Sequence, residues 1–179
     1  IKQLVLTSIL VLFASAVFAE TKMRITLQLP LKAHLGQNLL VFKKELEKRS
    51  DIIVEIYDSA QLYKDKEVPQ AVGSGAIEAG VASLTRFAGT NPEVDIFYLP
   101  FLFDSEEKIR KATKSGSKIR QVLDPAISKS GAVPLYYQAY GSAVMLSNGT
   151  PMNTPAAFKN KKIRVFGKTL GAFVSSLGA

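Results

Sequence analysis

A change of periodicity within the first sixty residues limits the fold more than any other feature. Residues 23–28 alternate apolar and polar side chains, a period of two that indicates a strand. After Pro30, apolar residues recur at steps of four, three and four, at Leu35, Leu39, Phe42 and Leu46. This spacing is one face of a helix, and residues 52–56 alternate again as a second strand. The β-α-β order predicts an α/β fold with parallel pairing and a right-handed crossover.

Further short helices and strands are expected along the rest of the chain. Helices are predicted over residues 65–72, 105–113, 117–128 and 168–177, with a short helix that opens at Thr154-Pro155 and closes at Asn160. Pro69 is tolerable in the first turn of its helix, and Asp104 with Glu107 resembles a capping box. Strands are expected over residues 77–83, 133–147 and 162–166, the second long enough for two strands.

The first nineteen residues have the pattern of a secretory signal peptide. Lys2 precedes an uncharged apolar stretch that ends in Val17-Phe18-Ala19, and this stretch is shorter than the ~20 residues of a spanning helix. An uncleaved membrane anchor is the alternative. We expect the true start to lie before Ile1, because no methionine precedes it. The remaining residues, with no cysteine, suit a periplasmic protein stabilised by ordinary packing.

The net charge of +8 raises the question of nucleic-acid binding. Export argues against it, and so does the mixing of acidic and basic residues, for example over residues 43–48. A positive field of this kind favours a small anionic ligand.

Catalytic motifs are weak. His34 is the one histidine, and a lone histidine at a helix start is more often a capping or surface group than a catalyst. The stretch from Gly73 to Glu78 lacks the third glycine of a dinucleotide fingerprint, and Gly167-Lys168-Thr169 lacks the first glycine of a phosphate loop. No metal-ligand spacing is present. We therefore expect a binding protein without enzymatic activity or a cofactor.

Three local strings resemble one known family when they are taken together. They are residues 75–80, Gly-Ala-Ile-Glu-Ala-Gly; Pro92 followed by residues 98–103, Tyr-Leu-Pro-Phe-Leu-Phe; and residues 154–165, Thr-Pro-Ala-Ala-Phe-Lys-Asn-Lys-Lys-Ile-Arg-Val, with Leu-Gly-Ala at 177–179. In this order and after a signal peptide, they resemble the DctP-type solute-binding proteins of TRAP (tripartite ATP-independent periplasmic) transporters.

The resemblance implies a two-lobed, type II-like periplasmic binding protein that closes over an organic acid and delivers it to a membrane permease. The first lobe is expected over residues 20–140 and is largely present. The interlobe strand and the start of an incomplete second lobe are expected over residues 141–179, because the family's sequence continues further. Arg164 is implied to pair with the ligand carboxylate, and Gln28 and Ser83 to supply polar contacts. Strand-end or turn hydrogen bonds are the alternatives at the last two positions.

This chain departs from the family pattern at three places. Many members carry a second arginine in the segment that here reads Gly-Ser-Ala-Val-Met at 141–145, which bears on whether a second carboxylate is bound. Phe166 replaces the usual proline and would stack over an apolar part of a ligand or belong to the core, and Tyr63 replaces a glycine. Alternative functions are a periplasmic α/β enzyme using His34, a binding component of another transporter class, and a sensor lobe.

Overall fold

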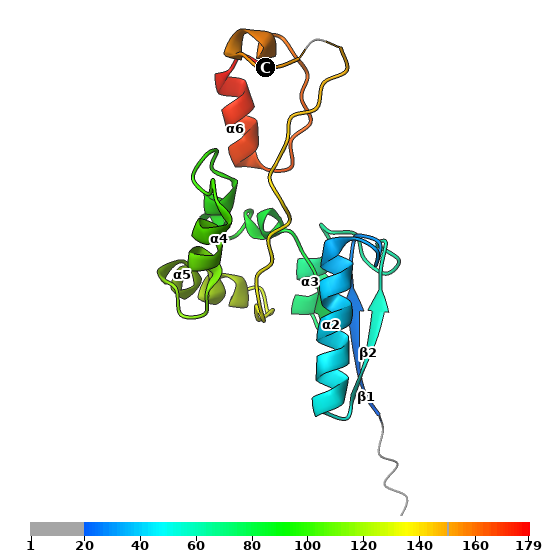
Figure 1. Cartoon of the computed structure of the whole chain (residues 1–179). Helices are drawn as coiled ribbons and strands as arrows, with labels where there is room; N and C mark the ends of the chain where they lie inside the picture. The colour runs from blue at the N-terminus through cyan, green and yellow to red at the C-terminus, as the bar shows by residue number, and fades with distance from the viewer. Residues whose placement is uncertain (1–19, 150) are drawn as a thin grey trace, which may run out of the picture.

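The computed structural model describes residues 20–149 and 151–179 (Figure 1). A three-stranded sheet stands near the N-terminus, with strands β1 Thr21–Thr26, β2 Ile52–Tyr57 and β3 Ala79–Gly80 in the order β2-β1-β3. Both neighbours pair with β1 in parallel, and Thr21 lies opposite Ile52 in the register. The predicted parallel α/β fold is confirmed. Strand β3, however, occupies only two of the residues expected between 77 and 83.

Helix α2, His34–Arg49, connects the first two strands and covers the sheet with its apolar side. Its buried residues Leu35 and Leu39 pack against Ile25, Leu27 and Val54 of the strands. Because these residues are the ones that the two periodicities place on facing surfaces, the first core follows from the local pattern.

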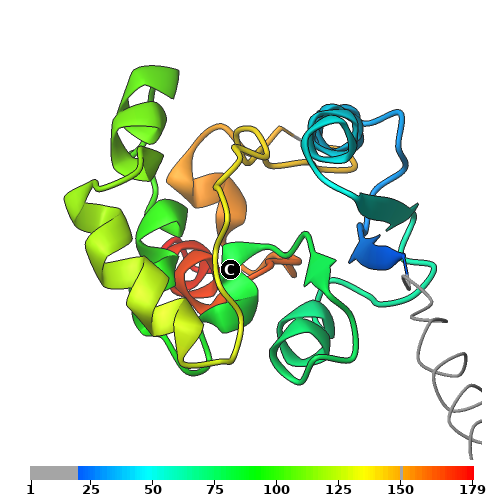
Figure 2. The same cartoon turned by 90° about the horizontal axis from the view of Figure 1, so that it is seen from below.

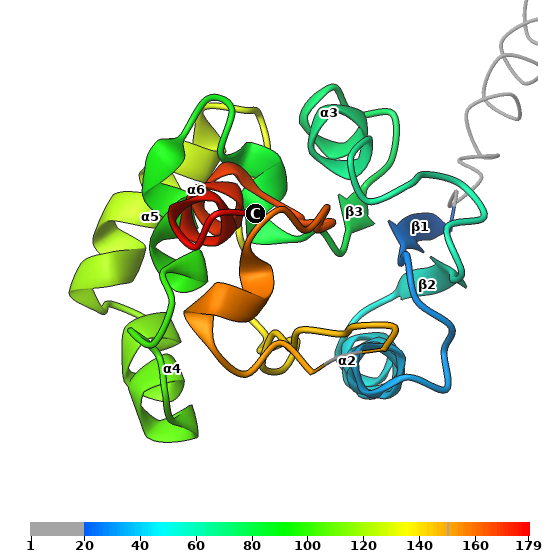
Figure 3. The same cartoon turned by 90° about the horizontal axis from the view of Figure 1, so that it is seen from above.

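Helix α3, Val68–Gly73, is shorter than predicted and has its proline near the N-terminus. Figure 3 shows α2 and α3 on either side of the strands. The C-terminal end of α3 meets the loop after α5 at two glycines, because a Cβ on Gly73 would lie 2.0 Å from the carbonyl oxygen of Ser130. Gly131 has φ +85° and approaches the same turn from the other side. This backbone contact joins the sheet to the helical region.

The helical region consists of the 3-10 segments η1 Leu84–Phe87 and η2 Pro92–Tyr98 and the helices α4 Glu106–Thr113 and α5 Lys118–Ser128. A second core forms here from Phe87, Val94, Leu123 and Ile127. The N-cap of α4 is Ser105, whose hydroxyl accepts the backbone N–H of Lys108. The predicted capping box at Asp104 is therefore wrong, and that carboxylate binds the Lys108 ammonium group instead.

Residues 133–147 run as an irregular segment and belong to no strand. The segment leaves α5, where the Tyr137 hydroxyl donates to Asp124 at 2.7 Å, and reaches α2, where Tyr136 lies 6.1 Å from Phe42 between ring centroids. The expectation of one or two strands is wrong here, because a strand needs a neighbouring strand and this segment forms no ladder with the described residues.

The C-terminal unit, residues 151–179, contains the 3-10 segment η3 Pro155–Phe158 and the helix α6 Lys168–Ser176. The residues just after η3 and just after α6 meet. Asn160, in the left-handed region at φ 61°, donates its N–H to the carbonyl of Gly178 at 2.8 Å. Figures 1 and 2 show α6 beside the green helical region. Residues 162–166 form no ladder with the described residues, so the predicted strand there is not present.

The predicted signal peptide, residues 1–19, lies outside the described residues. In the rest of the chain, excepting residue 150, no helix combines the length and the apolar character that crossing a membrane requires.

Candidate ligand-binding site

Gln28 and Ser83 lie just beyond the carboxyl ends of neighbouring strands. Gln28 follows β1 by two residues and Ser83 follows β3 by three. Because β1 and β3 are parallel and adjacent, both residues lie at the same edge of the sheet, where ligands of open α/β sheets bind. The side-chain carbonyl oxygen of Gln28 is buried and has no hydrogen-bond partner among the described residues. A buried acceptor without a donor is costly, so this edge suits a ligand that donates a hydrogen bond.

An acidic residue from a neighbouring loop holds Ser83 in place. The backbone N–H of Ser83 donates to one carboxylate oxygen of Asp65 at 2.9 Å, and Arg86 donates to the other at 2.5 Å. The side chain of Asp65 is 18% exposed and that of Arg86 is 32% exposed. The loop after β3 is thus fixed by a partly buried ion pair, which leaves the Ser83 hydroxyl without a hydrogen bond to the described residues.

Arg164 is exposed and makes no hydrogen bond or ion pair with the residues that the structure describes. Its neighbour Val165 faces helix α6, because Cγ2 of Val165 lies 3.6 Å from an ideal Cβ on Gly171. Successive side chains of an extended backbone point in opposite directions. Such alternation would direct the exposed Arg164 side chain away from α6, so that α6 leaves its guanidinium accessible.

Phe166 brings the C-terminal unit against the loops of the sheet. Its ring meets Tyr98 of η2 edge to face at 5.6 Å, and its carbonyl accepts the Thr85 hydroxyl at 3.4 Å. Burial raises the pKa of the Tyr98 phenol, so this hydroxyl stays neutral. Phe166 was predicted either to stack on a ligand or to belong to the core. The structure shows it in contact with protein atoms, those of Tyr98 and Thr85.

The four predicted residues come from two parts of the chain: Gln28 and Ser83 follow strands β1 and β3, and Arg164 and Phe166 precede α6. Thr85, which binds the Phe166 carbonyl, is two residues from Ser83. Arg164 is likewise two residues from Phe166. No hydrogen bond links Arg164 to Gln28 or Ser83 among the described residues. The arrangement places a free guanidinium on one side and polar strand ends on the other.

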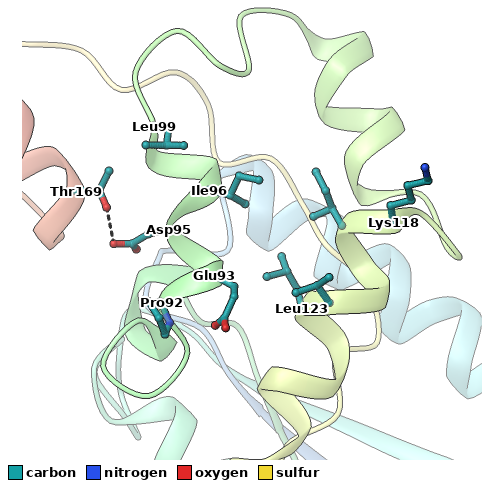
Figure 4. A pocket seen from close by; sticks show the side chains of 10 residues that line it. Pro92, Glu93, Asp95, Ile96, Leu99, Lys118, Leu123 and Thr169 are labelled. Carbon is teal, nitrogen blue, oxygen red and sulfur yellow. Dashed lines mark hydrogen bonds between the residues drawn. The ribbon is translucent and has the colours of Figure 1, made fainter.

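A separate, mainly apolar hollow of about 530 Å³ lies between η2 and α5 (Figure 4). Leu99, Leu123 and Asp95 line it, and Thr169 of α6 closes one side by donating its hydroxyl to Asp95 at 2.7 Å. None of the four predicted residues lines this hollow.

Outside the sheet, two polar residues with buried, unpartnered atoms were missed by the sequence analysis. They are Gln138, through its side-chain nitrogen, and Asp95, through one carboxylate oxygen, and neither atom has a partner within the described residues. The available signal was weak, since each is one polar residue in a largely apolar run.

His34 begins α2 and lies beside the irregular segment of residues 133–147. One ring nitrogen is 3.3 Å from the carbonyl oxygen of Ala139, and the ring meets Tyr140 edge to face at 6.2 Å. Among residues 20–149 and 151–179, no group of three or more acidic, histidine or cysteine side chains is arranged to hold a metal ion.

A parallel sheet with polar loops at its carboxyl edge, followed by a crossing segment and a further unit, agrees with the fold of the two-lobed periplasmic binding proteins. The model of the family DctP, bacterial extracellular solute-binding protein family 7, matches residues 27–179. The chain belongs to this family, and the predicted resemblance is confirmed.

Similar proteins agree with this assignment. The C4-dicarboxylate-binding periplasmic protein DctP of Rhodobacter capsulatus is 30% identical over 148 residues, covering 80% of this chain and 44% of that protein. A TRAP periplasmic solute-binding protein of Sulfurospirillum deleyianum with bound succinate has a TM-score of 0.77 at 26% identity, covering 90% of this chain and 53% of its own. Another from Pseudomonas aeruginosa, with bound L-malate, has a TM-score of 0.78 at 26% identity, covering 89% and 55%. The chain therefore spans about half the length of the relatives it matches.

Proposed function

We propose that this chain belongs to the solute-binding subunit of a TRAP transporter, which captures an organic acid through its carboxylate and delivers it to a membrane permease. Family membership and two similar structures, one with succinate and one with L-malate, support this proposal. The proposed location is the periplasm, after removal of residues 1–19, and no chemical step is involved.

The observation that carries the proposal is the free guanidinium of Arg164, on a segment that meets the loop after β3. A planar guanidinium offers two parallel N–H donors to a carboxylate and compensates its charge. Arg164 has no acidic partner among the described residues, so it is available to an anionic ligand. The other described arginines near the sheet are already paired, Arg24 with Glu78 and Arg86 with Asp65.

The other predicted residues take supporting roles in this proposal. Gln28 accepts a hydrogen bond from a ligand hydroxyl, since its carbonyl oxygen is buried and unpartnered. The Ser83 hydroxyl supplies a further polar contact. Phe166 forms part of the apolar wall, with Tyr98 behind it.

We assign the first lobe to residues 20–140 and the start of the second lobe to residues 141–179. The segment from Tyr140 to Met145 would carry the chain between them and act as part of the hinge. Ligand binding would draw the lobes together and exclude water from the carboxylate, which strengthens the ion pair with Arg164.

Titration of carboxylates into the full-length protein tests the anchor role of Arg164. The probes are succinate, L-malate and a sugar acid, measured by calorimetry on the wild type, on Arg164→Ala and on Arg164→Lys. We expect the alanine variant to bind at least about a hundredfold more weakly, because a charge-assisted bidentate contact is lost. The lysine variant should recover part of the affinity, since it keeps the positive charge but lacks the two parallel N–H donors of the guanidinium.

Arg49→Ala is the matched control, because it removes the same charge from an exposed i,i+4 pair with Glu45. Its affinity should equal that of the wild type. Equal binding by Arg164→Ala and the wild type would overturn the anchor role, and a wild type that binds none of the acids would count against the proposed function itself.

A further inference from the structure

A hydrogen bond from Thr169 to Asp95 joins the C-terminal unit to the rest of the molecule (Figure 4). The Thr169 hydroxyl lies in the first turn of α6, and the carboxylate belongs to η2, which precedes it by more than seventy residues. The distance is 2.7 Å and the contact is partly buried. A hydrogen bond to a carboxylate in a partly buried site stabilises more than an ordinary hydrogen bond on the surface.

The second oxygen of this carboxylate remains unused. Oδ1 of Asp95 is buried and has no partner among the described residues. Helix α6 begins at Lys168, and its N-cap residue Gly167 has no side chain to act as a cap. The first N–H groups of a helix lack acceptors within the helix. The Thr169 hydroxyl is thus the one described group of α6 that donates a hydrogen bond to this carboxylate.

The same surface holds the segment that leads to Arg164. A Cβ on Gly167 would lie 2.7 Å from the Thr85 hydroxyl oxygen, so the backbone approaches η1 closely here. The carbonyl of Phe166 accepts the same hydroxyl. The start of α6 is therefore placed against η1 and η2 only a few residues after Arg164, and any shift of this start moves the guanidinium with it.

We infer that Asp95 is a positioning residue for the ligand anchor: by accepting the Thr169 hydroxyl it fixes the first turn of α6 against η2, and this bond holds Arg164 in the arrangement that binds the ligand. This inference rests on the proposed function. Asp95 and Thr169 do not touch the ligand, and they raise affinity because the free energy of their contact favours the arrangement that binds it.

A double-mutant cycle in the full-length protein tests the inference. Succinate, L-malate and a sugar acid serve as probes, with Kd measured for Thr169→Val, Asp95→Ala and the double variant. Thr169→Val keeps the shape and removes the hydroxyl. We expect each single variant to raise Kd about tenfold and the double variant to raise it no further, since both remove the same bond.

Two control variants separate positioning from a general structural effect. Thr169→Ser keeps the hydroxyl and should bind within about twofold of the wild type. Thr113→Val removes a threonine hydrogen bond inside α4, where the hydroxyl donates to Ile109 at 2.9 Å, and should leave Kd unchanged.

Two outcomes would overturn the inference. One is an unchanged Kd in folded Thr169→Val, and the other is a double variant whose loss is the product of the two single losses. If Arg164→Ala loses binding while Thr169→Val does not, the inference fails and the proposed function stands. If the wild type binds no carboxylate, both fail.

Discussion

The β1-α2-β2 region and the C-terminal unit contain similar sequence patterns with different outcomes. In the first, an alternating run, a helix and another alternating run become two fully paired strands with a helix across them. In the second, the alternating run at residues 162–166 precedes a well-formed helix but pairs with none of the described residues. The comparison teaches that a helix satisfies its own backbone hydrogen bonds, whereas a strand depends on a neighbour.

The two regions also differ in how much they bury. Leu27 and Val54 are 0% and 2% exposed in the first core. In the C-terminal unit, Phe158 and Val174 are 7% and 5% exposed, with many exposed neighbours. We therefore expect the sheet region to dominate the stability of the described residues.

The largest expected effect is from a core truncation in the sheet region. Leu27→Ala should lower the free energy of unfolding of the full-length protein by about 3 kcal/mol, because the removed side chain leaves a cavity between the sheet and α2. Val174→Ala should cost less, about 2 kcal/mol, because fewer buried methyl groups are lost. Denaturant unfolding of both variants measures the difference. A larger loss for Val174→Ala would reverse the proposed ranking of the two regions.

A pair of glycine substitutions sharpens the comparison. Gly73→Ala should destabilise by about 2 kcal/mol, because its Cβ would lie 2.0 Å from a backbone oxygen that cannot move cheaply. Gly171→Ala, inside α6, has only an ordinary 3.6 Å contact with Val165 and should stabilise by about 0.5–1 kcal/mol through helix propensity. Thermal unfolding should thus give shifts of opposite sign, and shifts of equal sign would contradict the close approach at Gly73.

The smallest expected effect concerns pH. Hydrogen bonds from the side chain and the backbone N–H of Arg24 lower the pKa of Glu78 from its ordinary value of 4.5 to about 2. A pKa lowered by folding stabilises the protein above the ordinary value, and this contribution disappears as pH falls from about 4.5 toward 2. Wild type and Glu78→Gln should therefore differ in stability at neutral pH and converge on acidification.

The size of this pH effect is limited by solvent. The side chains of Arg24 and Glu78 are 41% and 38% exposed, so water screens their attraction. Glu93→Gln, which removes the same charge from a side chain without an ion-pair partner among the described residues, is the control for unfolding measured between pH 2 and 7. A wild-type advantage that persists at the acidic end would disprove the role assigned to the pair.

The sequence predicted the helices better than the strands, since the strands expected over residues 133–147 and 162–166 are not present. The helix at 117–128 and the helix at 168–177 were located within a residue or two. The cap of α4 was assigned to Asp104, although Ser105 performs it, because both types cap helices and only the backbone geometry distinguishes them.

For the candidate site, the sequence located the strand ends but not the contacts around them. Gln28 and Ser83 were predicted from the resemblance, and their shared edge follows from the strand order. The ion pair between Asp65 and Arg86 and the bond between Asp95 and Thr169 join residues far apart in the chain. No local pattern predicts such pairs.

Periodicity and motifs alone determined the β-α-β opening, the helix positions and the family, because each depends on residues close together or on a recognisable string. Only the tertiary structure decided that residues 133–147 join no sheet, that Phe166 lies against Tyr98, and that the start of α6 lies beside Asp95. These are choices of partner between distant segments, and the free energy of such contacts depends on where the whole chain places both groups.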